Sequence, residues 1–221
     1  MSSVIRLRQS NAFDLPKLQG IEDVRSSDKL IEMFIERFTQ KGDNIFDPFL
    51  GYGTTAIVSE RMERSGYGIE FEMDIVKFVH TMLKEKQHVV CGNSFYLETY
   101  SGFPQMDFSI SSPPYMIQGV DSSYPFYSSP IDNYYDDYLE KVGLVYRNLK
   151  RILKPNSYII VEACNVIYGE SFKTLAWDIA KTISKDYSFQ KEYIIEWIGK
   201  YRNFKLGLNH SYCFLFQNKV I

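Results

Sequence analysis

The chain has 221 residues, of which 45% are hydrophobic and 24% charged, and this composition is typical of one ordinary globular domain. The formal net charge is −2, so any contact with a nucleic acid has to come from a local basic patch and not from bulk charge. Three cysteines without a CxxC pair exclude a disulfide framework and a thiolate zinc site, and three scattered histidines argue against a metal centre. No apolar run reaches the ~18 residues of a membrane span. The N-terminal residues lack the apolar core of an export signal, so we expect a cytoplasmic protein that does not contact a membrane.

The chain is expected to consist of an N-terminal extension followed by a single domain. Residues 1–25 form the extension, in which residues 4–8 alternate like a short edge strand, and residues 26–221 form the domain. A capping run, Ser26–Asp28, precedes apolar residues at helical spacing, which predicts a helix over 27–40. The apolar residues of that helix are Leu30, Ile31, Phe34, Ile35 and Phe38.

Strand-like and helix-like patterns alternate from residue 44 to residue 186. The expected strands are 44–47, 67–70, 88–91, 107–111 and 158–162, and the expected helices are 54–64, 74–86, 136–153 and 171–186. This alternation predicts an α/β fold whose parallel strands are joined by right-handed crossovers. Two final runs, 189–199 and 211–218, have no helix between them, so they should pair antiparallel at one edge. An open sheet of this kind binds its ligand at the carboxyl ends of its strands.

The first strand of this series runs into a glycine-rich loop, Asp47–Gly53, and a helix begins at Thr54. Glycines let the backbone approach a ligand closely, and the helix N-terminus suits an anionic group such as a carboxylate. Glu70, at the end of the second strand, can hydrogen-bond two ribose hydroxyls, and Asn93, after the third, can read an adenine edge. The three strand ends match the three parts of S-adenosyl-L-methionine. The plainer interpretation is that a GxG motif occurs in many turns and that a glutamate at a strand end is a solvated charge.

The fourth strand runs into a proline-rich loop, Ser111–Tyr115. Two adjacent prolines fix φ and remove two donors, so the loop is stiff and presents carbonyl oxygens. The Ser112 hydroxyl and the Pro113 carbonyl can accept both hydrogens of a planar NH2 group, and Tyr115 can stack on its ring. Accepting those hydrogens would favour a pyramidal nitrogen that attacks a sulfonium methyl group, without a metal or a covalent enzyme intermediate. The plainer interpretation is a proline-rich turn.

Two motifs together, Asp47-Pro48-Phe49-Leu50-Gly51-Tyr52-Gly53-Thr54-Thr55 and Ser112-Pro113-Pro114-Tyr115, resemble the N4-cytosine/N6-adenine amino-methyltransferase family of DNA modification methylases. The resemblance implies the class I methyltransferase (Rossmann-like) fold, with a mostly parallel seven-stranded sheet, helices on both faces and an antiparallel C-terminal edge strand. It also implies S-adenosyl-L-methionine as the cofactor. The implied cofactor-binding residues are Ser27, Asp47, Pro48, Phe49, Gly51, Gly53, Thr54, Glu70, Phe71, Asn93 and Ser94. The implied catalytic residues are Ser112, Pro113, Pro114 and Tyr115.

The resemblance makes methyl transfer to a nucleobase amine in DNA the first hypothesis. Within the family, SPPY resembles the version found most often in cytosine-N4 enzymes, and an Asp-headed version leans towards adenine N6. The catalytic motif follows the cofactor motif here, whereas it precedes it in many SPPY members, and no separate target-recognition region is visible. Structured RNA, such as a cytidine of ribosomal RNA, is therefore the second hypothesis. A protein glutamine amide and a non-catalytic cofactor-binding subunit are the remaining alternatives.

The expected target surface consists of one long loop and one basic turn. Loop 116–137 is rich in aromatic residues, among them Tyr124 and Tyr127, which can either stack on unpaired bases or fold the loop onto the sheet. The turn between the last two strands carries Lys200, Arg202 and Lys205, without an acid, and can contact a nucleic-acid backbone. The expected partner is a nucleic acid, with a homodimer left open.

Overall fold

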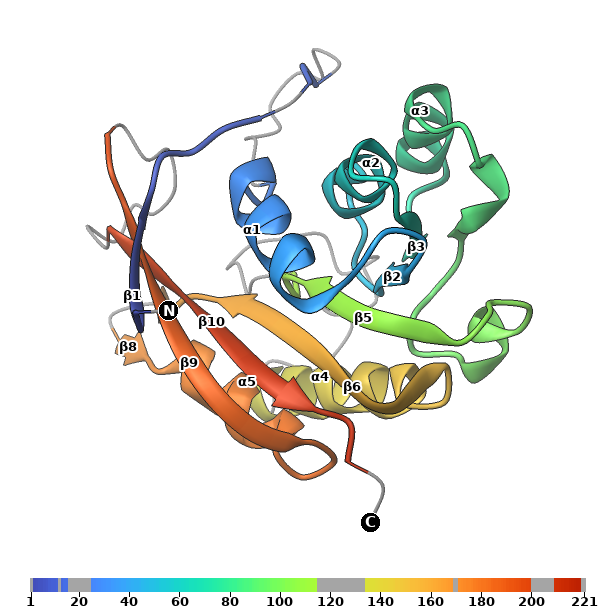
Figure 1. Ribbon diagram of the computed structural model, residues 1–221. Helices are drawn as coiled ribbons and strands as arrows, with labels where there is room; N and C mark the ends of the chain where they lie inside the picture. Colours follow the sequence, from blue (N-terminus) through green and yellow to red (C-terminus); the bar gives the residue numbers. More distant parts are fainter. Residues whose placement is uncertain are drawn as a thin grey trace.

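One eight-stranded sheet, with helices on both faces, organises the described part of the chain (Figure 1). The computed structural model describes residues 2–11, 13–15, 25–114, 134–168, 171–199 and 209–219. The strands of the sheet are β1 (Val4–Leu7), β2 (Asn44–Asp47), β3 (Ser65–Glu70), β4 (Val89–Cys91), β5 (Met106–Ser111), β6 (Leu153–Ala163), β9 (Ser188–Trp197) and β10 (His210–Gln217). Their order is β1-β9-β10-β6-β5-β2-β3-β4.

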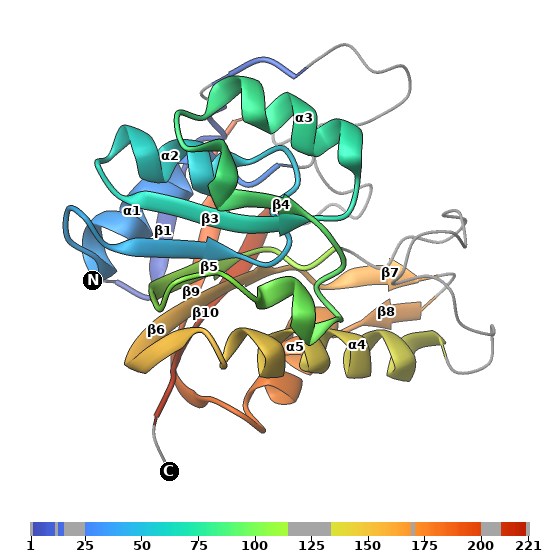
Figure 2. The ribbon, with the colours of Figure 1, turned by 90° about the vertical axis from the view of Figure 1, so that its right-hand side faces the viewer.

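All strand pairs in this sheet are parallel except the two made by β10, which runs antiparallel to β6 and to β9. The helices are α1 (Asp28–Phe38), α2 (Thr54–Arg61), α3 (Met73–Met82), α4 (Tyr134–Leu149) and α5 (Leu175–Ile183), with short 3-10 turns at η1 (Lys86–His88) and η2 (Leu97–Tyr100). Helices α1, α2 and α3 cover one face of the sheet, and α4 and α5 cover the other (Figures 1 and 2). The expected α/β class is thereby confirmed.

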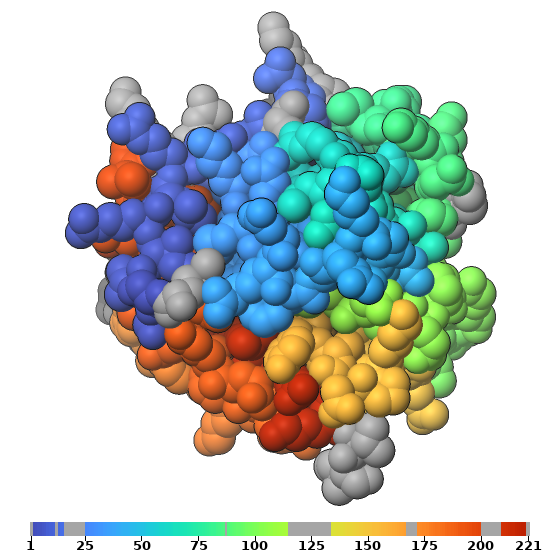
Figure 3. Space-filling view, in the orientation of Figure 1, coloured from blue at the N-terminus to red at the C-terminus, as the bar shows by residue number. Residues whose placement is uncertain are grey.

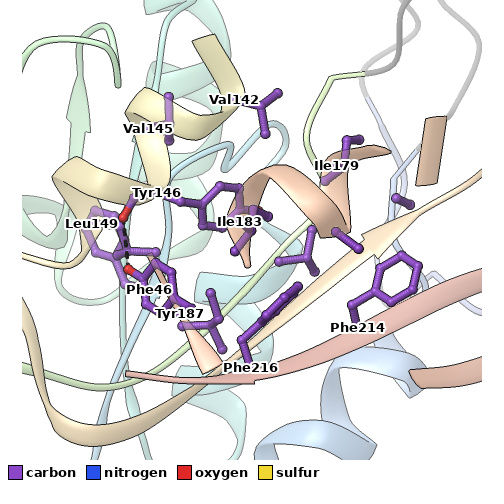
Figure 4. Packing of buried hydrophobic residues seen from close by; sticks show 14 of the residues in the cluster. Phe46, Val142, Val145, Tyr146, Leu149, Ile179, Ile183, Tyr187, Phe214 and Phe216 are labelled. Atoms are coloured by element: carbon purple, nitrogen blue, oxygen red, sulfur yellow. Dashed lines mark hydrogen bonds between the residues drawn. The ribbon is translucent and has the colours of Figure 1, made fainter. Parts of the chain in front are cut away.

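Apolar layers hold the helices to both faces of the sheet, and α2 and α3 share a further cluster that includes Ala56, Val76 and Val89. The layer under α4 and α5 includes Val142, Ile179 and Phe214, which Figure 4 shows on α4, on α5 and on a strand of the sheet. The layer under α1 includes Phe34, Phe108 and Leu215. Alternate residues of one strand therefore enter opposite layers, as the pleat of a sheet buried on both faces requires.

The last strand is antiparallel, as expected, but the expectation that it forms the edge of a seven-stranded sheet is wrong. Strand β10 lies between β6 and β9, and β1 pairs with β9 as the outermost strand, which makes eight among the described residues. The physical reason is that consecutive residues of β10 are buried on both faces, Cys213 in one layer and Phe214 in the other. A strand of that kind belongs inside a sheet.

The N-terminal segment contributes the edge strand expected near residues 4–8, so part of the predicted extension is built into the sheet. Figure 3 shows this segment, in dark blue, lying beside α1 and against β9 in orange. Division of the chain into an extension and a domain stays a prediction.

Several element bounds differ from those expected. Helix α4 ends at Leu149 and β6 begins at Leu153, so the expected helix over 136–153 is too long at its C-terminal end. The expected helix over 171–186 begins only at Leu175, because its first residues form a two-stranded ribbon of β7 (Val166–Tyr168) and β8 (Ser171–Lys173). Helix α2 ends at Arg61 rather than at residue 64, and α3 at Met82 rather than at residue 86.

No helix among the described residues is long and apolar enough to cross a membrane.

Candidate active site

The glycine-rich loop follows β2 at the carboxyl edge of the sheet, where the sequence places it. Gly51 and Gly53 both have positive φ, +52° and +84°, a backbone conformation that residues with a side chain rarely adopt. A Cβ added at Gly51 would meet nothing within 4 Å, so the backbone of the loop borders open space. Helix α2 starts directly after Gly53, and no side-chain hydrogen bond caps its N-terminus.

Asp47 sits at the base of this loop and is buried. Its Oδ1 accepts a hydrogen bond from the Phe49 N–H at 2.9 Å, and its Oδ2 accepts one from the Thr55 hydroxyl at 2.7 Å. Burial is the main cause that raises the pKa of Asp47 to about 7, while these two hydrogen bonds act in the opposite direction. The carboxyl group is therefore held in one orientation at a cost to its charged form.

Glu70, at the end of β3, is oriented by two backbone donors. Its Oε2 accepts from the Gly51 N–H at 2.9 Å, and its Oε1 accepts from the Glu72 N–H at 2.8 Å. The side chain is buried, and this burial raises its pKa. The hydrogen bond to Gly51 joins the glycine loop to the second strand end, so two of the predicted cofactor residues form one unit.

The third strand end is braced against the first. The Ser94 hydroxyl donates to the Pro48 carbonyl at 2.5 Å, and Asn93 Oδ1 accepts from the Phe95 N–H at 2.9 Å. The amide oxygen of Asn93 therefore stabilises its own turn, which leaves its NH2 group as the end suited to a ligand. Phe71, after β3, is 40% exposed, a large apolar surface beside these loops.

The proline-rich loop leaves β5 at the same edge of the sheet. Ser111 is buried, with its Oγ 2.9 Å from the Tyr146 hydroxyl, whereas Ser112 is partly exposed. The Pro114 carbonyl accepts a hydrogen bond from the Tyr138 hydroxyl at 2.9 Å. Tyr115 lies outside the described residues.

Strand pairing brings the two loops together. Strands β2 and β5 are parallel neighbours, with Phe46 opposite Ser109, so their carboxyl ends emerge side by side (Figure 2). Tyr146 of α4 touches both ends, because its hydroxyl meets Ser111 and its ring packs edge-on against Phe49 at a centroid distance of 6.2 Å. The glycine loop and the proline loop thus border one site.

Other predicted site residues are either engaged elsewhere or not described. Ser27 is buried, and its hydroxyl accepts from the Ser10 N–H at 3.1 Å, so a contact with the cofactor stays a prediction. The end of the predicted target loop, residues 134–137, is the first turn of α4. The remaining predicted nucleic-acid contacts, Tyr124, Tyr127, Lys200, Arg202 and Lys205, lie outside the described residues.

Sequence reasoning missed the role of the α4 tyrosines in supporting the proline loop. The apolar face expected for this helix included Tyr146, but it began at Leu139, whereas the buried residue is Tyr138, one position earlier. The signal was present, since Tyr138, Val142 and Tyr146 recur at a spacing of four residues. Glu162, buried at the end of β6, was also missed, because a glutamate inside a strand pattern normally indicates a solvated side chain.

The fold and the joined loops at its carboxyl edge define the class I methyltransferase architecture. The solved structure of TrmN from Thermus thermophilus aligns with a TM-score of 0.57 over 87% of this chain and 49% of that one, at 12% identity. The [4+2]-cyclase SpnF aligns with a TM-score of 0.60 over 91% of this chain and 86% of that one, also at 12% identity. Identities this low establish the fold alone, and a cyclase among the neighbours shows that the fold does not fix the chemistry.

A match to a known family lies in one segment of the chain, around the glycine-rich loop. Residues 24–81 match the family described as "DNA methylase", which confirms the resemblance to the N4/N6 amino-methyltransferases over this segment. Type II methyltransferase M2.DpnII of Streptococcus pneumoniae is 35% identical over 68 residues, which are 31% of this chain and 25% of that protein. Type II methyltransferase M.BglII of Bacillus subtilis is 33% identical over 63 residues, 28% of this chain and 18% of that protein. The matched stretch thus spans about a quarter or less of these relatives. The expected cofactor, S-adenosyl-L-methionine, is the one that methyltransferases of this class use.

Proposed function

We propose that this protein is an S-adenosyl-L-methionine-dependent methyltransferase that methylates the exocyclic amino group of a nucleobase in DNA, cytosine N4 first and adenine N6 second. The observation that carries the proposal is the joining of the two loops. Strands β2 and β5 are parallel neighbours, and Tyr146 contacts both Phe49, two residues after Asp47, and Ser111, the residue before the SPPY motif. A donor site and an acceptor site on the same edge are what direct transfer requires.

The residues at the glycine loop suit this cofactor chemically. Glu70 offers two oriented carboxylate oxygens, which can accept from the two hydroxyls of a ribose. Asp47 offers a buried carboxylate for an ammonium group, and the N-terminus of α2 offers backbone N–H groups for a carboxylate. The open space at Gly51 lets a ligand approach the backbone. When bound, the cofactor would supply an electrophilic methyl group.

The proline loop supplies acceptors for the amino group. Ser112 is partly exposed, and its hydroxyl and the Pro113 carbonyl would accept the two amino hydrogens. Accepting both hydrogens holds the nitrogen in place and increases its pyramidal character, so its lone pair can point at the methyl carbon. Tyr115 would stack on the base, which has to leave the duplex to reach the loop.

Replacement of Ser112 tests the proposed role directly. We expect Ser112→Ala to lower the turnover number about 100-fold or more, because one preorganised acceptor at the reacting group is lost. The dissociation constant of S-adenosyl-L-methionine, measured by calorimetry, should stay within about twofold, since the hydrogen bonds that orient Asp47 and Glu70 do not involve Ser112. Ser101→Ala, in an exposed turn on the far side of η2, is the matched control and should behave like the unchanged protein.

The substrate is identified by transfer of a tritiated methyl group to purified DNA, total RNA and protein in parallel. Nucleoside mass spectrometry of the labelled nucleic acid then separates N4-methylcytosine from N6-methyladenine. Labelled RNA with unlabelled DNA would replace the DNA proposal with the RNA one. Cofactor binding without transfer to any acceptor would refute the enzymatic proposal in favour of a supporting subunit.

A further inference from the structure

Helix α4 holds the proline loop at two points. The Tyr146 hydroxyl lies 2.9 Å from Ser111 Oγ, and the Tyr138 hydroxyl donates to the Pro114 carbonyl at 2.9 Å. Both tyrosines are buried, and the hydrogen bond between Tyr146 and Ser111 is buried with them. The two contacts flank the Ser112–Pro113 pair in the sequence.

These two contacts hold the proline loop on both sides of Ser112 and Pro113. Ser111 is held through its side chain and Pro114 through its backbone carbonyl. Ser112 and Pro113 each precede a proline, which restricts both to extended backbone conformations, and each proline fixes its own φ. The segment between the two contacts therefore has little conformational freedom.

The loop offers several acceptors between the two contacts. They are the Ser112 hydroxyl and the backbone carbonyls of Ser112 and Pro113, and Ser112 is partly exposed. The Pro114 carbonyl differs from these, because one of its two lone pairs already accepts from Tyr138. The Ser112 hydroxyl and the Pro113 carbonyl are the two acceptors that the proposed function assigns to the amino group.

We propose that Tyr138 is a positioning residue of the catalytic loop, which holds the Pro114 carbonyl so that the Ser112 hydroxyl and the Pro113 carbonyl are the pair offered to the amino group. The inference rests on the proposed function, because it assigns how that same site selects its two acceptors. Tyr138 acts through the loop and does not touch the substrate. Removal of its hydroxyl should therefore impair turnover more than it impairs binding of either ligand.

Tyr138→Phe removes the hydroxyl and keeps the ring, and Tyr187→Phe is its matched control. Tyr187 is also buried, and its hydroxyl also donates to a backbone carbonyl at 2.9 Å, that of Tyr146 on the same helix (Figure 4). We expect Tyr138→Phe to lower kcat about 10-fold or more, with the KM of the acceptor and the cofactor affinity within about twofold. Tyr187→Phe, with a comparable loss of stability, should keep the kcat of the unchanged protein. Equal kcat values in the two variants would overturn the inference.

The hydrogen bond from Tyr138 to the Pro114 carbonyl, called the anchor below, can also be tested by NMR without a measurement of activity. Pro114–Tyr115 is the one Pro–Tyr pair in the sequence, so carbonyl-13C proline combined with 15N tyrosine selects the Pro114 carbonyl signal in NMR. We expect this signal to move upfield in Tyr138→Phe and to stay in place in Tyr187→Phe, because a carbonyl loses deshielding with its hydrogen bond. An unmoved signal in Tyr138→Phe overturns the anchor. A moved signal in a protein that methylates no acceptor retains the anchor and refutes the proposed function.

Discussion

At the scale of single residues, the buried carboxyl group of Asp47 makes the stability of the folded protein depend on pH. The carboxyl is buried and its pKa is raised from 3.8 to about 7, so between those values the unfolded chain ionises while the folded chain stays protonated. The stability that this group contributes is complete below pH 3.8 and is lost as the pH rises through about 7. The loss is about 4 kcal/mol, from three pKa units at about 1.4 kcal/mol each, and any relaxation of the loop reduces it.

Asp47→Asn should therefore flatten the decline of stability with pH. We expect the free energy of unfolding of the variant, measured by urea titration, to exceed that of the unchanged protein at pH 8 and to approach it at pH 5. Asp74→Asn is the control, because Asp74 is exposed and pairs with Lys77, which lowers its pKa. A variant as steeply pH-dependent as the unchanged protein would show that Asp47 is ionised throughout.

Residues of the candidate site could be predicted from the sequence where a glycine pair indicates a special backbone conformation or where a residue ends a predicted strand. Gly51 and Gly53 were predictable, because only a turn with positive φ or a close approach makes two glycines useful there. Glu70 was predictable from its place at a strand end. The bond from Gly51 to Glu70 and the bond from Tyr138 to Pro114 were not, because they join residues whose distance depends on how the helices and loops pack.

At the scale of elements, periodicity predicted the strands near the site well and the region after α4 poorly. Strand β2 has the expected bounds, because turn residues flank a short apolar run. Strand β6 begins five residues before the expected Tyr158, although Pro155 and Asn156 look like a break in the pattern. Its pairing with β5 shifts register between Met106 and Phe108, which accommodates these residues. Such irregularities depend on the neighbouring strand and leave no period in the sequence.

The contact between α2 and β3 can be tested at Gly66. A Cβ there would come 2.5 Å from the Ala56 Cα and 2.7 Å from its carbonyl oxygen, so α2 would have to move as a body. We expect Gly66→Ala to lower the free energy of unfolding by about 1–3 kcal/mol or more and to weaken cofactor binding, because the glycine loop leads into α2.

Gly143→Ala in α4 is the matched control for that packing test. The added Cβ would lie 3.0 Å from Thr182 Cγ2, the end of a side chain that can turn away, and alanine favours a helix over glycine by about 1 kcal/mol. We expect a change of less than about 1 kcal/mol in urea titration. If Gly66→Ala proves as stable as Gly143→Ala, the close packing of α2 on β3 does not constrain the loop.

At the scale of the whole molecule, Glu162 joins parts of the chain that are distant in sequence. Its Oε2 accepts from the Ser26 hydroxyl at 2.7 Å, before α1, and its Oε1 accepts from the Ser211 hydroxyl at 3.1 Å, in β10. Ser211 in turn accepts from the Trp197 indole N–H at 3.1 Å, at the end of β9. One carboxyl group therefore fixes the segment before α1 and the final pair of strands to β6, beside the proline loop on β5.

Two replacements of Glu162 distinguish the effect of its charge from the effect of its hydrogen bonds to Ser26 and Ser211, which make it a junction between distant segments. Burial raises its pKa above 4.5, so its contribution to stability is lost as the pH rises from 4.5 through that raised value. Glu162→Gln retains the junction without the charge. Because the buried carboxyl of the unchanged protein loses stability as the pH increases, the free energy of unfolding of the variant should increase relative to that of the unchanged protein over the same range. Glu162→Ala leaves the buried Ser211 hydroxyl and the partly buried Ser26 hydroxyl without their acceptor and should cost about 2–4 kcal/mol.

Hydrogen exchange distinguishes a junction from a local contact. In Glu162→Ala we expect amides of residues 25–30, 194–197 and 210–213 to lose protection together, because the three segments share one acceptor. Glu162→Gln should keep that protection. Faster exchange confined to β6 would mean that the segments are held independently, and that the N-terminal part of the chain is placed beside the site by β1 and α1 alone.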